Sequence, residues 1–263
     1  ATGTAEPVGR AWNELPEIPK RCQWANFLRN HDELSLDQLT EDERERVYRA
    51  FAPDEDMRAY GRGIRRRLAP MLGGDQRRVE LMYSLLFSTP DTPILNAGEE
   101  LGLGDDLRLK ERESSRTPMQ WSGDEPNAGF STADPSRLVR PVVTDGPFAF
   151  GRVNVAAQER DPRSLLHFVR HAVRTYKANP AFGRGAWTFL SADDPAVLVH
   201  RCELDGHSVY AVHNLSCEAK AVQADLPDGL ADVFHDTATA YEPIRGGRVH
   251  LRPYGYRWLR PRE

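Results

Sequence analysis

Two short apolar runs, each followed directly by charged and amide side chains, constrain the fold of this chain more than any other feature. The first run lies in Cys22–Leu34 and ends in the cluster Arg-Asn-His-Asp-Glu at residues 29–33, and the second begins at Thr92 and runs into Asn96–Glu100. Little polar alternation interrupts either run, which is typical of parallel strands covered on both faces. We therefore expect two buried strands whose polar ends lie where ligands bind in parallel α/β folds, although a solvated loop explains such a cluster about as well.

Helical patterns separate the two runs. Thr40 with Glu43 three residues later has the arrangement of a capping box, and Asp75 is placed to cap a second helix. Two strands joined through helices, with both polar ends on the same side, form a βαβ unit whose crossover we expect to be right-handed. Because two strands do not close a sheet, we expect the missing strands to come from elsewhere. The first residue is Ala1 rather than Met, and the chain looks as though it starts within a longer protein.

The remainder divides into an irregular segment, a helix and a region of short strands. Residues 102–160 show almost no periodicity, which is typical of functional loops or disorder. Asp161 is expected to cap a helix that ends at Asn179-Pro180. Further on the apolar period is two, and Asp205-Gly206 between two apolar runs predicts a hairpin within a small antiparallel β domain.

Composition argues against several classes of function. The chain has 40% hydrophobic and 28% charged residues with a formal net charge of -4, which is typical of a soluble protein and argues against a nucleic-acid partner. No apolar run approaches the length of a membrane span and no leader is visible, so we expect a cytoplasmic protein with no membrane partner. Cys22, Cys202 and Cys217 are too few and too widely spaced for a disulfide framework or a metal knuckle, so we expect no metal site.

Several motifs resemble glycoside hydrolase family 13, the α-amylase superfamily. "FLRNHDEL" is similar to the family's Asn-His-Asp signature after barrel strand seven, "TPILNAGEELG" to its strand eight, and "RTPMQW" to a motif of its maltose-active members. "GIRRRLAP", "NAGFS" and "YGYRWLR" together are most similar to the trehalose synthase subgroup. The resemblance implies an α/β fold: the C-terminal part of a (β/α)8 TIM barrel over residues 1–180, with strands seven and eight, the loop 102–160 and the last barrel helix. An all-β sandwich domain then covers residues 181–263.

The resemblance also assigns roles to individual residues. It implies that Asp32 binds the hydroxyls of the sugar ring and stabilises the oxocarbenium-like transition state, and that His31 holds the same ring. Arg116 matches a position that gates the second sugar subsite, and Glu99 is expected to bind substrate. Arg116 and Glu99 have structural alternatives as well, because a loop arginine pairing with a nearby glutamate, or a glutamate buried beside an arginine, explains them nearly as well.

Two carboxylates are needed for retaining cleavage of a glucosidic bond. A pairing of Asp32 with Glu99 or Glu100 is not favoured, because the family's nucleophilic Asp and acid/base Glu belong to strands four and five. No Gly-x-Arg-x-Asp run is present in this sequence. We therefore expect the chain to require the N-terminal part of a barrel and to be inactive alone. At strand eight, Asn96-Ala97 stands where the family usually has Tyr-Tyr, which puts the substrate specificity in doubt.

The expected function follows from the same resemblance. It implies an enzyme that isomerises maltose to trehalose by retaining glucosyl transfer, with maltose, trehalose or short α-glucans as its binding partners. The alternatives are an α-glucosidase or transglucosidase of the same family, and a non-catalytic carbohydrate-binding or assembly partner. No cofactor is implied, and a calcium ion in the full-length protein is left open.

Overall fold

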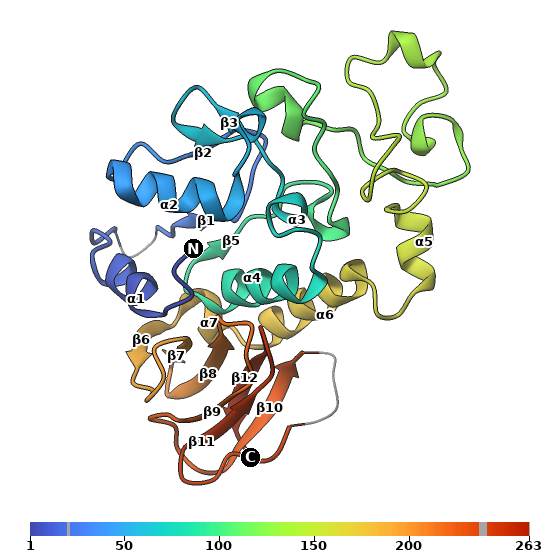
Figure 1. The fold of residues 1–263 in the computed structure, drawn as a ribbon. Helices are drawn as coiled ribbons and strands as arrows, with labels where there is room; N and C mark the ends of the chain where they lie inside the picture. Colours follow the sequence, from blue (N-terminus) through green and yellow to red (C-terminus); the bar gives the residue numbers. More distant parts are fainter. Residues whose placement is uncertain (20–21, 237–240, 263) are drawn as a thin grey trace. The chain divides into compact units, whose positions relative to one another are not determined.

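The computed structural model describes residues 1–19, 22–236 and 241–262 (Figure 1). By their internal contacts the residues group into two compact units. The first unit consists of Phe27–Val79 and Leu95–Val169 together with Ala1, and the second consists of Thr2–Asn26, Glu80–Ile94 and Arg170–Glu263. The predicted domain boundary between residues 180 and 181 stays a prediction.

Helices and strands alternate in the N-terminal two thirds, and strands dominate thereafter. The helices are α1 (Glu6–Asn13), α2 (Glu41–Phe51), α3 (Leu68–Met71), α4 (Gln76–Ser88), α5 (Val155–Arg160), α6 (Leu165–Ala178) and α7 (Ala181–Arg184). The short 3-10 helices are η1 (Glu55–Met57), η2 (Glu99–Leu101), η3 (Glu111–Ser115), η4 (Pro126–Gly129) and η5 (Pro135–Arg137). The strands are β1 (Ala25–Asn26), β2 (Leu34–Ser35), β3 (Arg58–Ala59), β4 (Gly63–Ile64), β5 (Thr92–Pro93), β6 (Ala186–Leu190), β7 (Val197–Leu204), β8 (His207–Asn214), β9 (Lys220–Gln223), β10 (Leu230–His235), β11 (Arg248–Leu251) and β12 (Tyr256–Pro261).

The two strands of the predicted βαβ unit are parallel neighbours. β1 pairs with β5 in the register Ala25↔Thr92, and the amide of Ile94 donates to the carbonyl of Asn26 at 2.7 Å. The expectation that water does not reach the two runs is wrong, because Trp24, Phe27 and Ile94 are exposed. Each strand has two residues and the sheet that they form contains only these two strands in the described chain, so no further strand covers the apolar side chains.

The predicted helix caps are confirmed in α2 and α4 and wrong in α6. The hydroxyl of Thr40 accepts from the amide of Glu43 while the Glu43 carboxylate accepts from the amide of Thr40, which completes the capping box. Asp75 accepts from the amide of Arg77 at 3.0 Å and so caps α4. Asp161 accepts from the amide of Arg163 within a turn, and α6 begins only at Leu165 because this turn lies between Asp161 and the helix.

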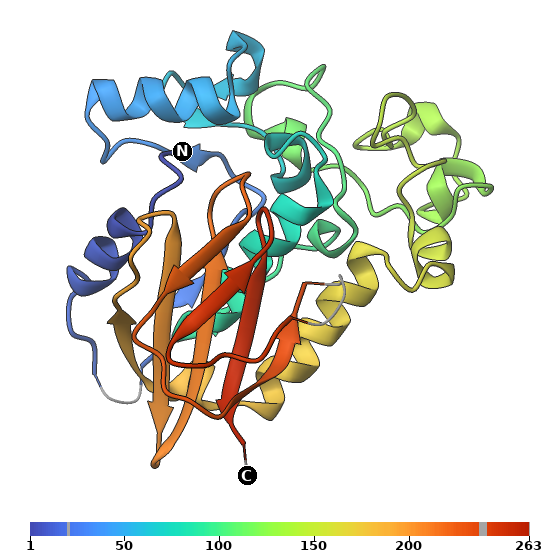
Figure 2. The same cartoon turned by 60° about the horizontal axis from the view of Figure 1, so that its bottom comes forward.

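An antiparallel sheet fills most of the second unit. Its five strands follow the order β10-β12-β8-β7-β6, and they lie side by side in Figure 2. The predicted hairpin is confirmed: Asp205 and Gly206 have φ of 50° and 80° between β7 and β8, as a two-residue turn of this kind requires. β9 and β11 form a separate pair whose Val222 and Val249 belong to one buried cluster with Val199 and Val212 of the larger sheet. The core of the β domain therefore lies between two packed sheets.

Buried hydrogen bonds connect the C-terminal half of α4 to this sheet. Nε1 of Trp258 donates to the hydroxyl of Ser84, and the same hydroxyl lies 2.9 Å from Nε2 of His213. Nε2 of His200 lies 2.9 Å from the carbonyl oxygen of Ser88. A carbonyl oxygen only accepts, so Nε2 of His200 carries a proton and donates to it.

Burial favours the neutral form of both His200 and His213 in the folded protein. Both side chains are fully buried, and their rings stack with centroids 5.8 Å apart. Burial lowers the pKa of His200 to about 4, and burial together with the neighbouring His200 holds the pKa of His213 well below its usual value.

We predict that the free energy of unfolding falls as the pH falls from about 6.5 to about 4. Unfolded histidine takes up a proton below about pH 6.5, whereas His200 in the folded chain does so only near pH 4. Stability from this group is therefore complete above pH 6.5, and about 3 kcal/mol is lost by pH 4. Urea unfolding at several pH values measures the slope. His250→Gln, an exposed control, is expected to leave the slope unchanged, and a flat profile between pH 6.5 and 4 would contradict the prediction.

Candidate active-site cluster around Asp32

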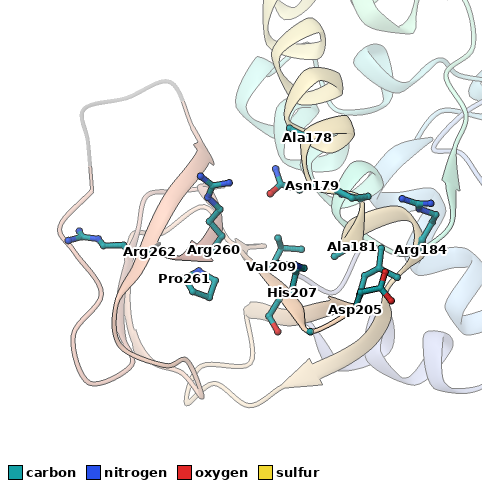
Figure 3. A pocket seen from close by; sticks show the side chains of 14 residues that line it. Ala178, Asn179, Ala181, Arg184, Asp205, His207, Val209, Arg260, Pro261 and Arg262 are labelled. Carbon is teal, nitrogen blue, oxygen red and sulfur yellow. The ribbon is translucent and has the colours of Figure 1, made fainter.

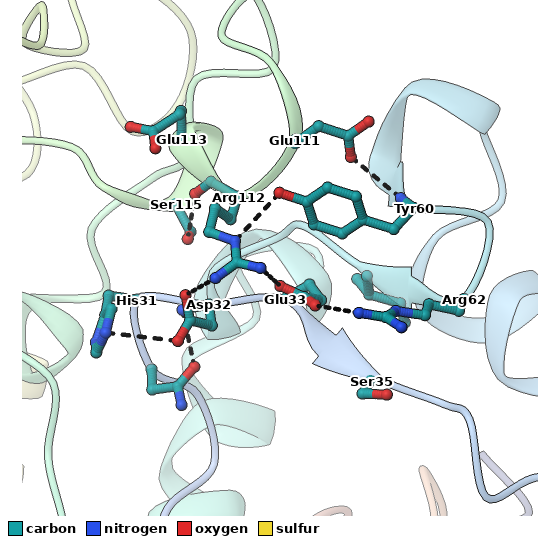
Figure 4. A network of polar contacts seen from close by, with 12 residues as sticks. His31, Asp32, Glu33, Ser35, Tyr60, Arg62, Glu111, Arg112, Glu113 and Ser115 are labelled. Atoms are coloured by element: carbon teal, nitrogen blue, oxygen red, sulfur yellow. Dashed lines mark hydrogen bonds and ion pairs between the residues drawn. The ribbon is translucent and has the colours of Figure 1, made fainter.

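The carboxylate of Asp32 lies at the centre of a polar cluster in the first unit (Figure 4). Its Oδ1 accepts from Nη1 of Arg112 at 2.8 Å and from Nη2 of Arg116 at 3.0 Å, and its Oδ2 lies 3.5 Å from Nε2 of His31. About a third of the Asp32 side chain is exposed. The structure thus brings together three of the four site residues that the sequence predicted.

A buried arginine holds the loop that carries Asp32. Arg29 is 2% exposed, and its Nε donates to the carbonyl of Arg66 at 2.7 Å while its Nη2 donates to the carbonyl of Asp32 at 2.9 Å. The amide of Asp32 donates to the side-chain oxygen of Asn30 at 2.9 Å, which closes a turn. These bonds fix the backbone on both sides of His31, and Figure 4 shows the Asp32 side chain directed towards Arg112.

Arg112 is a member of the cluster that the sequence analysis missed. Besides Asp32 it contacts Glu33, whose carboxylate lies 3.3 Å from Nη2, and its Nε donates to the hydroxyl of Tyr60 at 3.1 Å. Arg112 belongs to η3, which also includes Glu111, and the Glu111 carboxylate accepts from the amide of Tyr60. Nothing in the local sequence distinguishes Arg112 from other loop arginines, because its partners lie 52 to 80 residues away.

Arg116 contacts both Asp32 and a loop glutamate. Its Nη2 binds Asp32, its Nε donates to the carbonyl of His31 at 2.9 Å, and its Nη1 donates to Glu113 at 3.0 Å. Glu113 also accepts from Arg140. Arg116 therefore lies beside Asp32 and forms the pairing with a loop glutamate that the sequence analysis gave as its structural alternative, while its role at the second sugar subsite stays a prediction.

The surrounding cations keep Asp32 ionised. Partial burial acts to raise the pKa of Asp32, but the hydrogen bond from Arg116 and the charges of Arg112 and His31 outweigh it and hold the pKa below its usual value. At neutral pH the group is therefore an acceptor with two oxygens. Such a carboxylate can accept hydrogen bonds from hydroxyl groups and can stabilise positive charge that develops on a bound molecule.

Glu99 lies in a buried ion pair with an arginine, which is the structural alternative that the sequence analysis gave for it. Its side chain is 5% exposed and its Oε1 accepts from Nε of Arg67 at 2.9 Å. Arg67 also donates to the carbonyl of Ala97 at 2.6 Å, so the pair holds the loop that follows β5. Gly98 in this loop has a φ of 87°, and a Cβ there would lie 2.3 Å from Leu103, which requires glycine.

The described ranges contain neither a candidate metal site nor a membrane-spanning helix. Residues 1–19, 22–236 and 241–262 contain no group of three or more His, Cys, Asp or Glu side chains placed to hold a metal ion. Within the same ranges, no helix has the length and apolar character needed to cross a bilayer.

Comparison with known proteins relates both parts of the chain to sugar-active enzymes. Residues 65–185 match the model of the alpha amylase catalytic domain, and residues 187–258 match that of the maltogenic amylase C-terminal domain. The trehalose synthase of Thermus thermophilus is 44% identical over 257 residues, which are 95% of this chain and 26% of that protein. The trehalose synthase/amylase TreS of Mycolicibacterium smegmatis is 40% identical over 270 residues, which cover 98% of this chain and 45% of that protein.

A solved structure shows the fold to which the chain corresponds. The crystal structure of the alpha-amylase from H.orenii superposes with a TM-score of 0.64 at 19% identity, over 90% of this chain and 40% of that one. The chain spans less than half of each of these relatives. The predicted fold class is confirmed. The chain has the fold of the C-terminal part of an α-amylase TIM barrel, followed by an antiparallel β domain.

We predict that Arg116→Gln raises the pKa of Asp32 towards the value of a free aspartate. The hydrogen bond from Arg116 is the strongest of the contacts that favour the ionised carboxylate, and glutamine carries no charge. Titration of the Asp32 carboxyl carbon by 13C NMR measures the change. Arg140→Gln is the matched control, because Arg140 contacts Glu113 and not Asp32. An unchanged pKa in Arg116→Gln would show that the contact is absent in solution.

We predict that Glu99→Gln lowers the free energy of unfolding by about 3 kcal/mol. The substitution leaves the charge of Arg67 buried without its anionic partner, and an unpaired buried charge is strongly destabilising. Urea unfolding measures the loss. Glu55→Gln, at an exposed position of the same unit, is expected to change stability by less than about 0.5 kcal/mol. Equal free energies of unfolding for Glu99→Gln and the control variant would contradict a structural role for Glu99.

Proposed function

Because the chain belongs to the α-amylase family, glycoside hydrolase family 13, we propose that it supplies the strand-seven and strand-eight side of an active site that isomerises maltose to trehalose. The observation that carries the proposal is the ionised, accessible carboxylate of Asp32 next to His31 and Arg116. Identities of 40% and 44% to proteins named as trehalose synthases support this reaction over others of the family.

The exposure and charge of Asp32 support a role in binding a glucose ring and in stabilising the transition state of glucosyl transfer. A glucosyl group that leaves its bond develops positive charge on the ring, and a nearby carboxylate lowers the energy of that state. Oδ1 of Asp32 accepts from Arg112 and Arg116, whereas among the described residues the only partner of Oδ2 is the more distant Nε2 of His31. We assign Oδ2 to the sugar hydroxyls, with Nε2 of His31 as a second contact to the same ring.

Arg116 and Glu99 support the site in different ways. Arg116 is about one third exposed and bridges the carbonyl of His31, Asp32 and Glu113, which favours a position at the edge of the second sugar. The burial of Glu99 beside Arg67 favours a supporting role for the loop after β5 over direct contact with substrate.

Retaining glucosyl transfer also needs a nucleophile and a general acid. No residue of this sequence matches the family's nucleophile motif. We propose that both groups come from polypeptide outside the 263 residues and act on the bond that Asp32 helps to hold. The glucosyl group is then held covalently on the nucleophile while the released second glucose turns over within the site. Isomerisation requires that water does not reach the covalent intermediate during this interval.

The alternative is an α-glucosidase or transglucosidase of the same family. All three reactions share the covalent intermediate and differ in what attacks it, which is the same glucose, water or a second sugar. The long segment 102–160, which includes η3 with Arg112, forms part of the cluster and is the element expected to decide how much water reaches it. The ratio of trehalose to glucose formed from maltose separates the isomerase from the hydrolase.

We predict that Asp32→Asn in the full-length protein lowers the rate of maltose conversion by a factor of at least about 100. The amide keeps the size of the side chain and loses the negative charge that stabilises the transition state. Steady-state formation of trehalose and glucose measures the effect, and Asp54→Asn at an exposed position is the control. Near-normal turnover by Asp32→Asn would contradict the assignment, as would maltose conversion by the 263-residue chain alone.

A further inference from the structure

A cavity of about 550 Å³ in the second unit does not bring its charged side chains together. It is lined by the junction of α6 and α7, the turn between β7 and β8, and the end of β12. Figure 3 shows Arg184 and Arg260 at opposite ends of this cavity. A small-molecule site needs a few polar groups that converge on one point. Such a convergence exists in the first unit around Asp32, and it includes an exposed tyrosine to which the proposed function assigns no role.

Tyr60, in the turn between β3 and β4, is separated from the Asp32 carboxylate by one guanidinium group. Its hydroxyl oxygen accepts from Nε of Arg112 at 3.1 Å, and Nη1 of the same guanidinium donates to Oδ1 of Asp32 at 2.8 Å (Figure 4). Tyr60 is 44% exposed. Because a single planar group lies between the two side chains, the phenol is within reach of a disaccharide whose first ring lies on Asp32.

The backbone holds Tyr60 in a conformation that disfavours a large side chain. Tyr60 and Gly61 have φ of 53° and 64°. The amide of Arg62 donates to the carbonyl of Ala59 at 3.1 Å, which closes a turn of type I′. Asn, Asp and Gly are favoured at the first central position of this turn, whereas a bulky residue with positive φ is strained. Local turn chemistry therefore does not account for a tyrosine at this position.

A second strained residue fixes the position of Tyr60. Glu111, 51 residues later, has a φ of 49°, and its carboxylate accepts from the amide of Tyr60 at 3.1 Å. Arg112 follows it directly and contacts the phenol. Two neighbouring residues of η3 thus hold Tyr60 by its backbone and by its hydroxyl. Strained residues persist where the surrounding structure over-determines them, and they concentrate at catalytic and ligand-binding sites.

The hydroxyl of Tyr60 keeps its proton available for a ligand. A phenol oxygen accepts hydrogen bonds and also donates one. Tyr60 accepts from Arg112, and among the described residues no acceptor receives its O–H. A hydroxyl that accepts from a cation is polarised, which makes it a stronger donor. Burial does not explain the side chain either, because nearly half of the residue is exposed.

We propose that Tyr60 donates its phenolic proton to a hydroxyl oxygen of the second glucose of maltose and holds that glucose in the site after the glucosidic bond is cleaved. The inference rests on the proposed function, since it requires a first glucose ring on Asp32. Tyr60 makes no bond to the reacting atoms. It is a residue that determines specificity, because it decides whether the released glucose or water meets the covalent intermediate.

The two products differ only in what attacks the intermediate. For trehalose, the anomeric oxygen of the retained glucose bonds to C1 of the glucosyl group, the bond from C1 to the nucleophile breaks, and the proton of the attacking hydroxyl passes to the general base. When the second glucose leaves, water attacks C1 in the same way and the product is glucose. Loss of the contact with Tyr60 therefore shifts the products from trehalose to glucose.

Steady-state kinetics of the full-length protein with Tyr60→Phe test the proposal. The variant keeps the ring and loses only the hydroxyl. We expect KM for maltose to rise about three- to tenfold, because one hydrogen bond to a neutral group is lost. For the same reason the ratio of trehalose to glucose is expected to fall at least about threefold. Hydrolysis of p-nitrophenyl α-glucoside, which has no second sugar, is expected to stay unchanged.

Tyr60→Asn separates a binding role from a structural one. Asparagine is favoured at this turn position, so the thermal midpoint is expected to stay equal or to rise, while KM and the product ratio change as in Tyr60→Phe. A structural tyrosine would give the reverse, a lower midpoint with an unchanged ratio. Tyr48→Phe is the matched control, because Tyr48 belongs to the same unit and is 3% exposed, and its kinetics are expected to equal those of the unmodified protein.

Two results overturn the inference. One is an unchanged ratio of trehalose to glucose in Tyr60→Phe. The other is an equal loss of rate on maltose and on p-nitrophenyl α-glucoside, which would mean that Tyr60 acts through Asp32 and not on the second sugar. Neither result contradicts the proposed function, which fails instead if Asp32→Asn converts maltose at a near-normal rate.

Discussion

An ionised carboxylate held between two guanidinium groups is the interaction on which the proposed site depends. Asp32 lies in the loop after β1, whereas Arg112 and Arg116 lie 80 and 84 residues later in a segment with little regular structure. Without these ion pairs the segment around η3 would have no charged contact with Asp32. The contacts therefore both place the carboxylate and order part of the loop that surrounds it.

Burial divides the polar interactions of the protein into two classes. The pair Arg67–Glu99 and the histidines His200 and His213 are almost inaccessible to water, so their partners are fixed and loss of one partner is costly. Asp32 is about one third exposed, so water screens its ion pairs and exchange of a partner is easier. A substrate-binding group needs this second condition, because it has to give up an existing contact when a sugar arrives. The buried pairs supply the rigidity that the exposed cluster lacks.

Local patterns in the sequence predicted local structure well. The capping box at Thr40 and the turn at Asp205-Gly206 involve residues only a few positions apart, and both are present. The position of the loop after a parallel strand pointed to His31 and Asp32, and the family resemblance named Arg116 as well; the structure places the three side chains in contact. The contact of Arg112 with Asp32 depends on the path of a long irregular segment, which no periodic pattern encodes.

Burial was harder to predict than position. Trp24 and Phe27 form an apolar run that is typical of a covered strand, yet both are exposed, because burial depends on neighbouring strands and not on the run itself. The start of α6 was wrong for a related reason: Asp161 caps a local turn, and a side chain that bonds an amide two residues on does not reveal how soon the helix begins. Glu99 beside Arg67 shows the same limit, since sequence spacing does not separate a buried ion pair from a substrate contact.

The second partners of the two arginines explain how Asp32 can bind a neutral sugar. Arg112 retains Glu33 and the hydroxyl of Tyr60, and Arg116 retains Glu113. If Asp32 turns one oxygen towards a sugar hydroxyl, neither guanidinium is left without an acceptor, so the exchange avoids the cost of an unpaired charge. A single arginine with Asp32 as its only anion would resist such an exchange. The additional glutamates therefore make the carboxylate available to substrate while the arginines keep it ionised.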